Sequence, residues 1–430
     1  MVLLRLAAVS AAGLALCGSK HPFCFTKAEG DHAFSLLQFL TMLWGLVGPV
    51  VRIGPNDLSI NDLPVYLETT QLTSGFTKDP GFYRCISFPG TSIGEIDKDL
   101  HRIRRKVLAP AFSIARVSEL APLVLARVEQ LLTKFDDACT ADEALNITGA
   151  FHALTLDIIS EIVLGTSTNC IERPGFRHEF HDYLEASMGV GWVATAFPTV
   201  TTMALYMSSN MNIQVLPNHA TQLTRQCLSI TKRHLDERSK RDINSDSQSG
   251  SIRGKSAIIE CLLDPDSVKE HTVPATEKLN DEIVTLLTAG NDTTSNAMIF
   301  GVYQICINPG VYEKLSEELE THFPSLQDVV TYERAKSLPY LVSLHMSPYL
   351  LNRHPDVWEN ATDFRPERWL SESSQDLDKY VATFNKGPRQ CLGKDLAWCE
   401  LTLLFANVFR RYDLELVNPN MEWSDLILTK

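Results

Sequence analysis

The amino-acid sequence predicts a mainly α-helical protein with a small β-sheet, organised as one large domain over residues 48–430. Apolar residues recur at helical spacing through most of the chain after residue 98, and runs typical of strands are few. Apolar residues are 44% of the 430-residue chain, so a large core can be buried. The predicted helices are Arg116 to Asp137, Asn146 to Leu164, Leu279 to Ile307, Val311 to His322 and a helix after Gly393; the predicted strands are Val50 to Ile53, Leu58 to Ile60 and Asp413 to Val417.

Residues 1–47 form an apolar segment ahead of this domain. Met1 to Cys17 is interrupted by Arg5 and is slightly short for a spanning helix, which needs roughly 20 apolar residues. A signal peptide would need a better cleavage context than this segment offers. We therefore expect a marginal membrane anchor at this end of the chain.

Charge and cysteine content exclude some classes of protein. The formal net charge is −13, which argues against broad nucleic-acid binding, because such binding needs a basic surface. The ten cysteines are scattered, without a C-x-x-C pair, so a disulfide scaffold is not expected. Reduced thiols in a protein facing the cytosol are the simpler interpretation.

One cysteine, Cys391, lies in a segment with special surroundings. Glycines at 387 and 393 allow the backbone to approach closely, and Arg389 can reach a carboxylate. The helical pattern after Gly393 places the sulfur near a helix N-terminus, which favours a thiolate. Phe384 can shield the loop from water. The alternative is a buried structural cysteine in a Gly-Pro turn, but the segment predicts a haem-thiolate loop with Cys391 as the axial ligand of the iron.

A polar segment interrupts the longest predicted helix, from Ala289 to Thr294. Small residues at Ala289 and Gly290 would leave room for dioxygen. The acid Asp292 and the hydroxyl of Thr293 could loosen the helix and bring protons to the site. The alternative is an ordinary helix whose buried hydroxyl groups bond to its own backbone.

A basic cluster runs from His101 to Lys106. A charged helix face in water is the ordinary interpretation of such a cluster. However, His101 and Arg105 are one helical turn apart, so both can face one pair of carboxylates, such as the propionates of a haem.

Taken together, these segments resemble the cytochrome P-450 monooxygenases. The cysteine loop fits the family signature F-x-x-G-x-R-x-C-x-G at every defined position, and Ala289 to Thr294 fits [AG]-G-x-[DE]-T-[TS]. His101 and Arg105 match the family's haem-binding W/H-x-x-x-R spacing. The residues from Gly48 to Asn56 resemble those of fungal secondary-metabolism members of the trichodiene oxygenase kind.

The resemblance implies a fold, a reaction and partners. It implies a haem b cofactor, electrons from NADPH through a partner reductase, and insertion of one oxygen atom from O2 into a small lipophilic substrate, such as a terpenoid or polyketide. Attachment to the endoplasmic reticulum membrane, facing the cytosol, is implied as well. The implied catalytic residues are Asp292 and Thr293; the implied haem-binding residues are His101, Arg105, Ala289, Gly290, Phe384, Gly387, Arg389, Cys391 and Gly393.

The chain departs from the family near residue 345. The family's E-x-x-R helix is missing: its lead-in, Leu338 to Leu341, and its follow-on, Tyr349 to Trp358, nearly abut around Leu344 to Met346. After Trp423 the family usually continues into a final hairpin, so the resemblance leads us to expect that this hairpin is missing as well. Arg368, in a segment that matches P-E-R-[FW], is therefore expected to lose its buried carboxylate partner, which is costly for a buried charge.

Three explanations of this gap stay open: a wrongly joined or mis-spliced gene model, a degenerate protein with little haem, or compensation by another segment. The contrasting function is thus an inactive, haem-poor remnant. A serine-hydrolase string at Gly90 to Gly94 is a further alternative, but its context predicts a loop and not the strand and helix that hydrolase chemistry needs.

Overall fold

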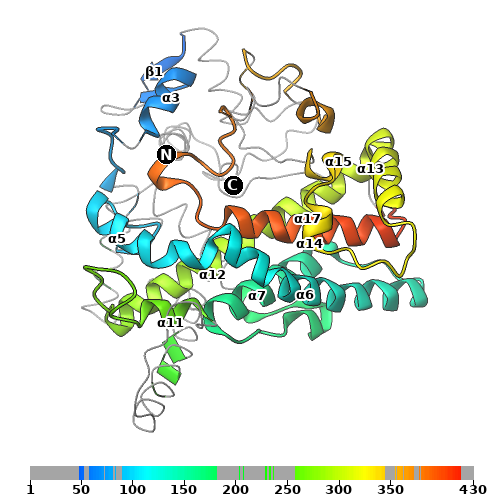
Figure 1. Ribbon diagram of the computed structural model, residues 1–430, viewed down its shortest axis with the longest axis horizontal. Helices are drawn as coiled ribbons and strands as arrows, with labels where there is room; N and C mark the ends of the chain where they lie inside the picture. The colour runs from blue at the N-terminus through cyan, green and yellow to red at the C-terminus, as the bar shows by residue number, and fades with distance from the viewer. Residues whose placement is uncertain are drawn as a thin grey trace. The chain divides into compact units, whose positions relative to one another are not determined.

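The computed structural model describes residues 48–52, 58–71, 73–80, 90–181, 257–343, 356–361, 363–371 and 379–417, with isolated residues between these ranges. The expected anchor at residues 1–47, the junction around Leu344 to Met346 and the end of the chain after residue 417 lie outside the described residues. The helices and strands are shown in Figure 1. They are β1 Val50–Arg52, β2 Leu58–Ile60, α3 Leu63–Thr69, α5 Lys98–Leu108, η1 Ala109–Phe112, α6 Ile114–Ala141, α7 Ile147–Leu164, η2 Cys170–Glu172, η3 Pro174–Phe176, α11 Ile258–Leu262, α12 Thr276–Ile307, α13 Pro309–His322, α14 Tyr332–Ala335, α15 Pro339–Ser343, η6 Pro366–Trp369, η7 Gly387–Arg389 and α17 Lys394–Arg411.

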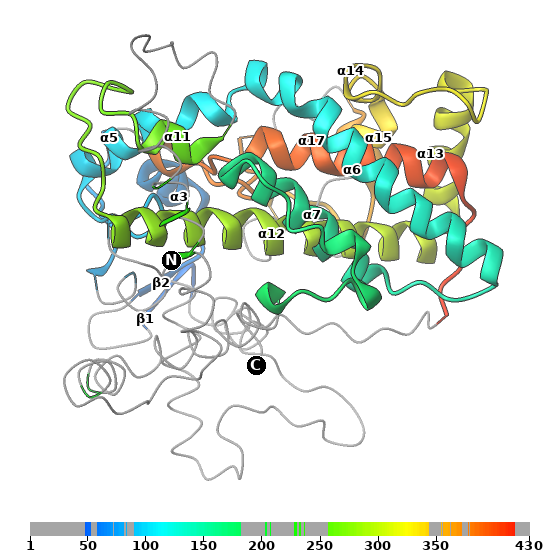
Figure 2. The same ribbon diagram turned by 90° about the horizontal axis from the view of Figure 1, so that it is seen from below.

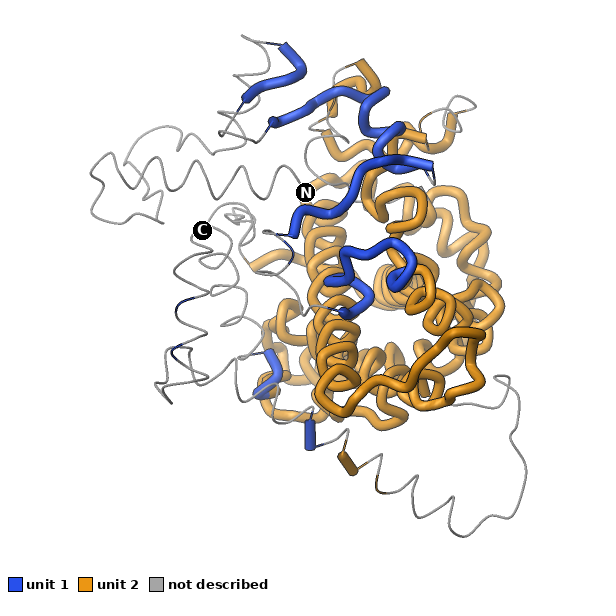
Figure 3. The backbone as a smooth tube through the Cα atoms, turned by 90° about the vertical axis from the view of Figure 1, so that its left-hand side faces the viewer, with its two compact units in different colours: residues 1–101, 179–230, 421–430 blue, residues 102–178, 231–420 orange. Residues whose placement is uncertain are grey.

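The chain divides into two compact units, coloured in Figure 3. The first comprises residues 1–101, 179–230 and 421–430, and the second comprises residues 102–178 and 231–420. In the first unit β1 pairs antiparallel with β2, and Val50 lies opposite Ile60. These two strands confirm the first two strand predictions. Residues 90–94 form turns, as expected for the loop predicted at the G-x-S-x-G string.

The second unit holds the long helices, and α6 shows why the sequence forms them. The Ser113 hydroxyl accepts a hydrogen bond from Arg116 N at 3.3 Å and so caps the helix start. The helix ends at Asp142, which takes the left-handed conformation with φ 54°. The predicted apolar face is buried except for Leu123, which is half-buried. Its fully buried members are Val117, Leu120, Val124, Val128, Leu131 and Leu132.

The centre of this unit is the packing of α7 against α12, which run beside each other in Figures 1 and 2. A Cβ at Gly290 would lie only 2.6 Å from Ile159 Cγ1, so the glycine lets the two helices approach closely. Gly301 does the same for α17, since a Cβ there would lie 2.5 Å from the ring of Phe405. Of the described helices, α7 alone is by itself long and apolar enough to cross a membrane, and 72% of it is buried inside the protein.

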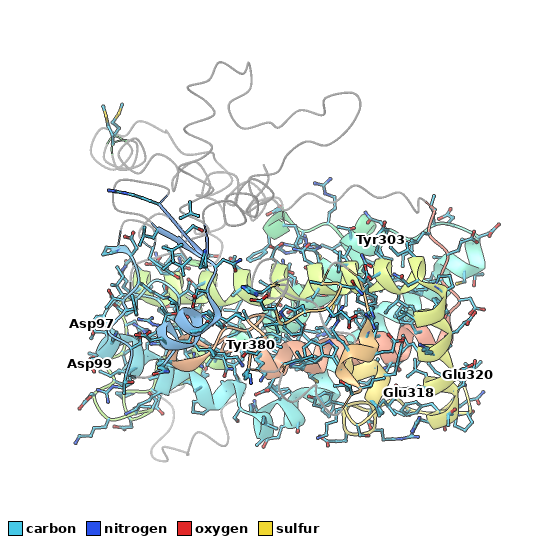
Figure 4. The ribbon with its side chains drawn as sticks, turned by 90° about the horizontal axis from the view of Figure 1, so that it is seen from above. Asp97, Asp99, Tyr303, Glu318, Glu320 and Tyr380 are labelled. Carbon is cyan, nitrogen blue, oxygen red and sulfur yellow. The ribbon has the colours of Figure 1, made fainter. Side chains whose placement is uncertain are left out.

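Helix α13 fixes the start of α15. The carboxylate of Glu318, labelled in Figure 4, accepts hydrogen bonds from Tyr340 N and Leu341 N at 2.8 Å each. These N–H groups have no partner within their own helix, so an acid at this position stabilises the helix start. The described part of α15 then ends at Ser343.

The third strand prediction is wrong. Residues 413–416 follow α17 as irregular chain, without a strand. The Leu414 N–H is donated to the Tyr312 hydroxyl at 3.0 Å, so a side chain takes the bond that a sheet neighbour would otherwise receive.

Candidate active site

The cysteine loop turns tightly before α17. Cys391 N donates to Phe384 O at 2.7 Å, which closes the loop over the residues between them. Gly387 has φ 69°, a conformation that favours glycine, and this requirement explains its place in the pattern. The Phe384 ring lies 6.2 Å from the Trp398 ring, so Phe384 packs against α17.

The sulfur of Cys391 is surrounded by hydrogen-bond donors. The N–H groups of Gly393 and Lys394 point at it from the start of α17, and the Arg105 guanidinium lies near it. Gly393 has an ordinary backbone conformation, and a Cβ there would meet no protein atom within 4 Å. The Gly393 N–H therefore has a role in bonding the Cys391 sulfur. No protein contact requires a glycine at this position, and the space that its side chain would fill is open.

The pKa of the Cys391 thiol reflects opposed effects. The residue is exposed, yet enough protein surrounds its sulfur that burial raises the pKa above its ordinary value. The Gly393 N–H, the Arg105 guanidinium and the Lys394 N–H lower it, and Asp395 raises it. The raised pKa differs from the sequence expectation of a thiolate stabilised by the helix start alone. A coordinated metal ion deprotonates a thiol outright, so ligation would supply what the loop lacks.

Helix α5 carries the predicted cationic partners. The Arg105 Nη1 donates to Gln390 O at 2.7 Å, which ties α5 to the residue beside the cysteine. Burial lowers the pKa of Arg105, and the neighbouring Cys391 raises it. His101 is buried on the same helix, and Arg389 is half-buried in the loop. Arg104, also on α5, lies 3.8 Å from the buried Glu282 of α12.

The polar segment of α12 is partly explained by packing. Gly290 faces Ile159, so its small size serves the contact with α7. Thr293 is exposed and its hydroxyl donates to Ala289 O at 2.7 Å, the local bond that the alternative interpretation expects. Asn291 is fully buried, and its Oδ1 accepts from the Thr155 hydroxyl of α7 at 2.9 Å.

The Asp292 carboxylate faces α7. Its Oδ1 lies 3.4 Å from His152 Nε2, and both side chains are partly exposed. Sequence reasoning missed His152 and Thr155, although both are polar residues three positions apart in the first half of a largely apolar helix. That spacing was the available indication that this face of α7 meets polar groups on a neighbour.

Arg368, which the sequence predicts to lose its carboxylate partner, has other hydrogen-bond partners among the described residues. Its guanidinium donates to four backbone carbonyls, at distances between 3.0 and 3.3 Å. The acceptors are Glu359 O, Asn360 O, Asp363 O and Arg365 O. Carbonyl oxygens carry partial negative charge, so these four groups stabilise the guanidinium where the sequence predicts the loss of a carboxylate.

The donor set fits a haem. A cysteine sulfur that accepts two backbone N–H groups at a helix start, open space beside Gly393, and an arginine next to the ligand meet the needs of an iron porphyrin with a thiolate ligand. The cysteine loop and the polar segment of α12 belong to the same compact unit. A mainly helical fold with this loop defines the class of haem-thiolate proteins.

Comparison with known proteins gives the family. The sequence profile of the family described as Cytochrome P-450 matches residues 64–344 and 342–429, so the match is made in two pieces that meet at 342–344. The chain belongs to the cytochrome P-450 family and is accordingly an oxidoreductase of the monooxygenase type. The interruption falls where the sequence predicts the missing helix.

Several fungal proteins are similar over most of their length. The chain is 50% identical to cytochrome P-450 monooxygenase sol6 of Alternaria solani over 390 residues, which cover 81% of each protein. It is 26% identical to cytochrome P-450 monooxygenase macH of Penicillium terrestre, over 89% of this chain and 82% of that protein. It is 27% identical to cytochrome P-450 monooxygenase TRI4 of Trichoderma arundinaceum, over 86% of this chain and 77% of that protein.

Proposed function

We propose that this chain is a haem-thiolate monooxygenase that inserts one oxygen atom from O2 into a small lipophilic substrate of secondary metabolism, a terpenoid or a polyketide. The observation that carries the proposal is the Cys391 sulfur, with the N–H groups of Gly393 and Lys394 and the guanidinium of Arg105 around it. The similarity to the fungal monooxygenases supports the same reaction type.

In this proposal, Cys391 holds the haem iron and its loop holds the ligand in place. His101, Arg105 and Arg389 provide the positive charge for the two propionates. When bound, the haem would supply the iron on which dioxygen is activated, and the Cys391 thiolate would favour cleavage of the O–O bond. Phe384 and Gly387 shape the loop, and Gly393 leaves the sulfur accessible.

The polar segment of α12 handles protons. The reaction consumes dioxygen, two electrons and two protons, and yields a hydroxylated product and water. Asp292 and Thr293 hold and pass on these protons. Ala289 and Gly290 have small side chains and so leave room for dioxygen beside the helix. The electrons come from NADPH through a partner reductase. Attachment to the endoplasmic reticulum membrane through residues 1–47 belongs to the same proposal.

The test is a spectrum of the reduced protein with carbon monoxide. The full chain, expressed with a supply of haem, is expected to give the Soret band of a thiolate-ligated haem, and Cys391→Ala is expected to abolish it. Cys139→Ala is the control, because Cys139 is also an exposed free cysteine but lies on α6. A soluble wild-type chain without the band would contradict the proposal, and a band that survives Cys391→Ala would exclude this ligand.

A second candidate function is an inactive, haem-poor remnant. It is favoured by one observation, the interruption of the family match at residues 342–344. Sequencing the transcript across codons 340–350 separates a joining error from a genuine deletion. If the transcript carries an additional segment, the hypothesis of an inactive remnant applies only to the shortened chain and not to the full-length protein.

A further inference from the structure

Arg104 of α5 keeps its guanidinium inside the protein. Its side chain is 19% exposed, and its Nη1 is buried without a hydrogen-bond partner among the described residues. Its Nε lies 3.8 Å from Oε2 of Glu282 on α12, a carboxylate whose side chain is fully buried. Burying a guanidinium costs free energy, so this placement needs a reason other than a charged helix face in water.

Exposure along α12 shows where this carboxylate stands. Glu282 precedes Ala289 by about two helical turns, so both lie on one face of the helix, which Thr293 continues. Thr293 is exposed and Ala289 is partly exposed, whereas Glu282 is fully buried. The face that the proposed function assigns to dioxygen is therefore open at Ala289 and Thr293 and closed at Glu282, where Arg104 lies.

The paired groups lie away from any molecule bound on that face. A bound molecule contacts atoms that have accessible surface, and both the Arg104 Nη1 and the Glu282 side chain lack it. Arg104 thus differs from Arg105 and Arg389, which are partly exposed and which the proposed function assigns to the propionates. Any effect of the pair on that face is carried by the helix on which Arg104 stands.

The next residue on α5 reaches in another direction. Arg105 Nη1 donates to Gln390 O at 2.7 Å, one residue before Cys391. Two successive arginines thus tie one helix to α12 and to the cysteine loop, and all these residues belong to the second compact unit. A short helix moves as a rigid element, so the tie at Arg104 fixes where Arg105 stands beside the loop.

We propose that Arg104 is a positioning residue, whose ion pair with Glu282 sets α5 against α12 and so places Arg105 at the cysteine loop for a haem propionate. An ion pair suits this role, because a shifted helix would separate two buried charges, whereas apolar contacts tolerate a shift. The consequence for haem rests on the proposed function, but the tie between α5 and α12 does not.

The first test measures how fast the full chain, loaded with haem, loses it to an excess of apomyoglobin. Arg104→Met keeps most of the side-chain length and removes the charge. It should speed haem loss by about tenfold, as the loss of an outer partner of a metal site typically does. Arg104→Lys keeps the charge and should stay close to the wild type. Lys106→Met is the control, because Lys106 carries the same charge on the same helix but is exposed.

Two results of this test would overturn the proposal. One is haem loss from Arg104→Met that is no faster than from Lys106→Met. The other is haem loss from Arg104→Lys as fast as from Arg104→Met, since the charge at this position would then have no effect.

Urea unfolding separates positioning from stability. Arg104→Met and Glu282→Gln together should cost less than the sum of the single variants, by about threefold or more in the unfolding equilibrium constant, because each single variant takes a buried charge away from the other. The double variant should still lose haem as fast as Arg104→Met. Additive losses of stability would exclude the ion pair. Haem retention that returns with stability would show that Arg104 acts through stability alone, against the proposal.

Hydrogen exchange gives a readout that needs no haem. The amides of α5 should exchange severalfold faster in Arg104→Met than in the wild type, and those of Lys106→Met should not change. Equal exchange in the two variants would mean that Arg104 does not hold α5. A wild-type chain that takes up no haem would contradict the proposed function, while unfolding and exchange still decide the tie between α5 and α12, so the two failures are distinguishable.

Discussion

The polar segment of α12 and the cysteine loop both carry family motifs, but the protein uses their unusual residues differently. In α12, Gly290 and Asn291 are explained by contacts with Ile159 and Thr155 of α7. At the loop, a Cβ added at Gly393 would meet no protein atom within 4 Å. Gly290 and Asn291 are thus required by the packing of the two helices, whereas no protein contact requires a glycine at position 393.

The largest expected effect is at Gly290. Gly290→Ala would place a methyl group 2.6 Å from Ile159 Cγ1, so the two helices must separate. Overpacking of this kind lowers the free energy of unfolding by about 2–3 kcal/mol. Urea unfolding measures it, with Gly310→Ala as control, because a Cβ at Gly310 in α13 meets no atom within 4 Å. Equal stability of both variants would remove the contrast between helix and loop.

Glu400 extends the comparison to α17, the helix that follows the loop. Its side chain is buried, and among the described residues its Oε2 has no hydrogen-bond partner. Burial therefore raises the pKa of this carboxyl well above its ordinary value of 4.5.

The sign of the resulting pH dependence follows from proton binding. Between the unfolded and the folded pKa, the folded state binds more protons, so stability falls as the pH rises through that window. Glu400→Gln should remove this loss and gain on the order of 2 kcal/mol at about pH 8, but little at about pH 4. The measurement is urea unfolding of both proteins at several pH values. A constant difference between them across this range would contradict the assignment.

A smaller effect is expected at Thr155. Thr155→Val keeps the shape but leaves the buried Oδ1 of Asn291 without its donor, which should lower the unfolding free energy by about 1 kcal/mol. Thr140→Val is a control, because the Thr140 hydroxyl donates only to Asp136 O of its own helix and is exposed. If both variants lose the same stability, the bond between α7 and α12 contributes nothing of its own.

The smallest effect on stability is expected at Gly393. Gly393→Ala adds a methyl group into open space at an ordinary backbone angle, so the unfolding free energy should change by less than about 0.5 kcal/mol. Haem content per chain, measured after expression with a haem supply, should nevertheless fall. Unchanged haem content would show that Gly393 is not reserved for the cofactor.

Helices and the cysteine loop could be predicted from the sequence because their patterns are local. The buried residues of α6 recur at helical spacing, and the glycines of the loop stand at fixed distances from Cys391. Partners across helices could not be predicted this way. Whether His152 meets Asp292 depends on which face of α7 meets α12, and no short pattern contains that information.

One wrong prediction and one incomplete prediction have the same origin. Asp413 to Val417 has a strand-like pattern, but its backbone bonds to a tyrosine side chain 102 positions earlier. Arg368 was judged by one expected partner far away, while its guanidinium found nearby carbonyl groups. In both places the sequence shows the group that needs a partner, and only the folded chain shows which group provides it.

The four bonds of Arg368 have a consequence for folding order. Each joins residues between three and nine positions apart, so this turn has very low contact order. Loops this short close within about a microsecond, long before distant helices meet. The four bonds around η6 can therefore form early in folding. A chain that has lost sequence near residue 345 would keep this local nucleus, and any delay in folding would fall on the contacts between distant helices.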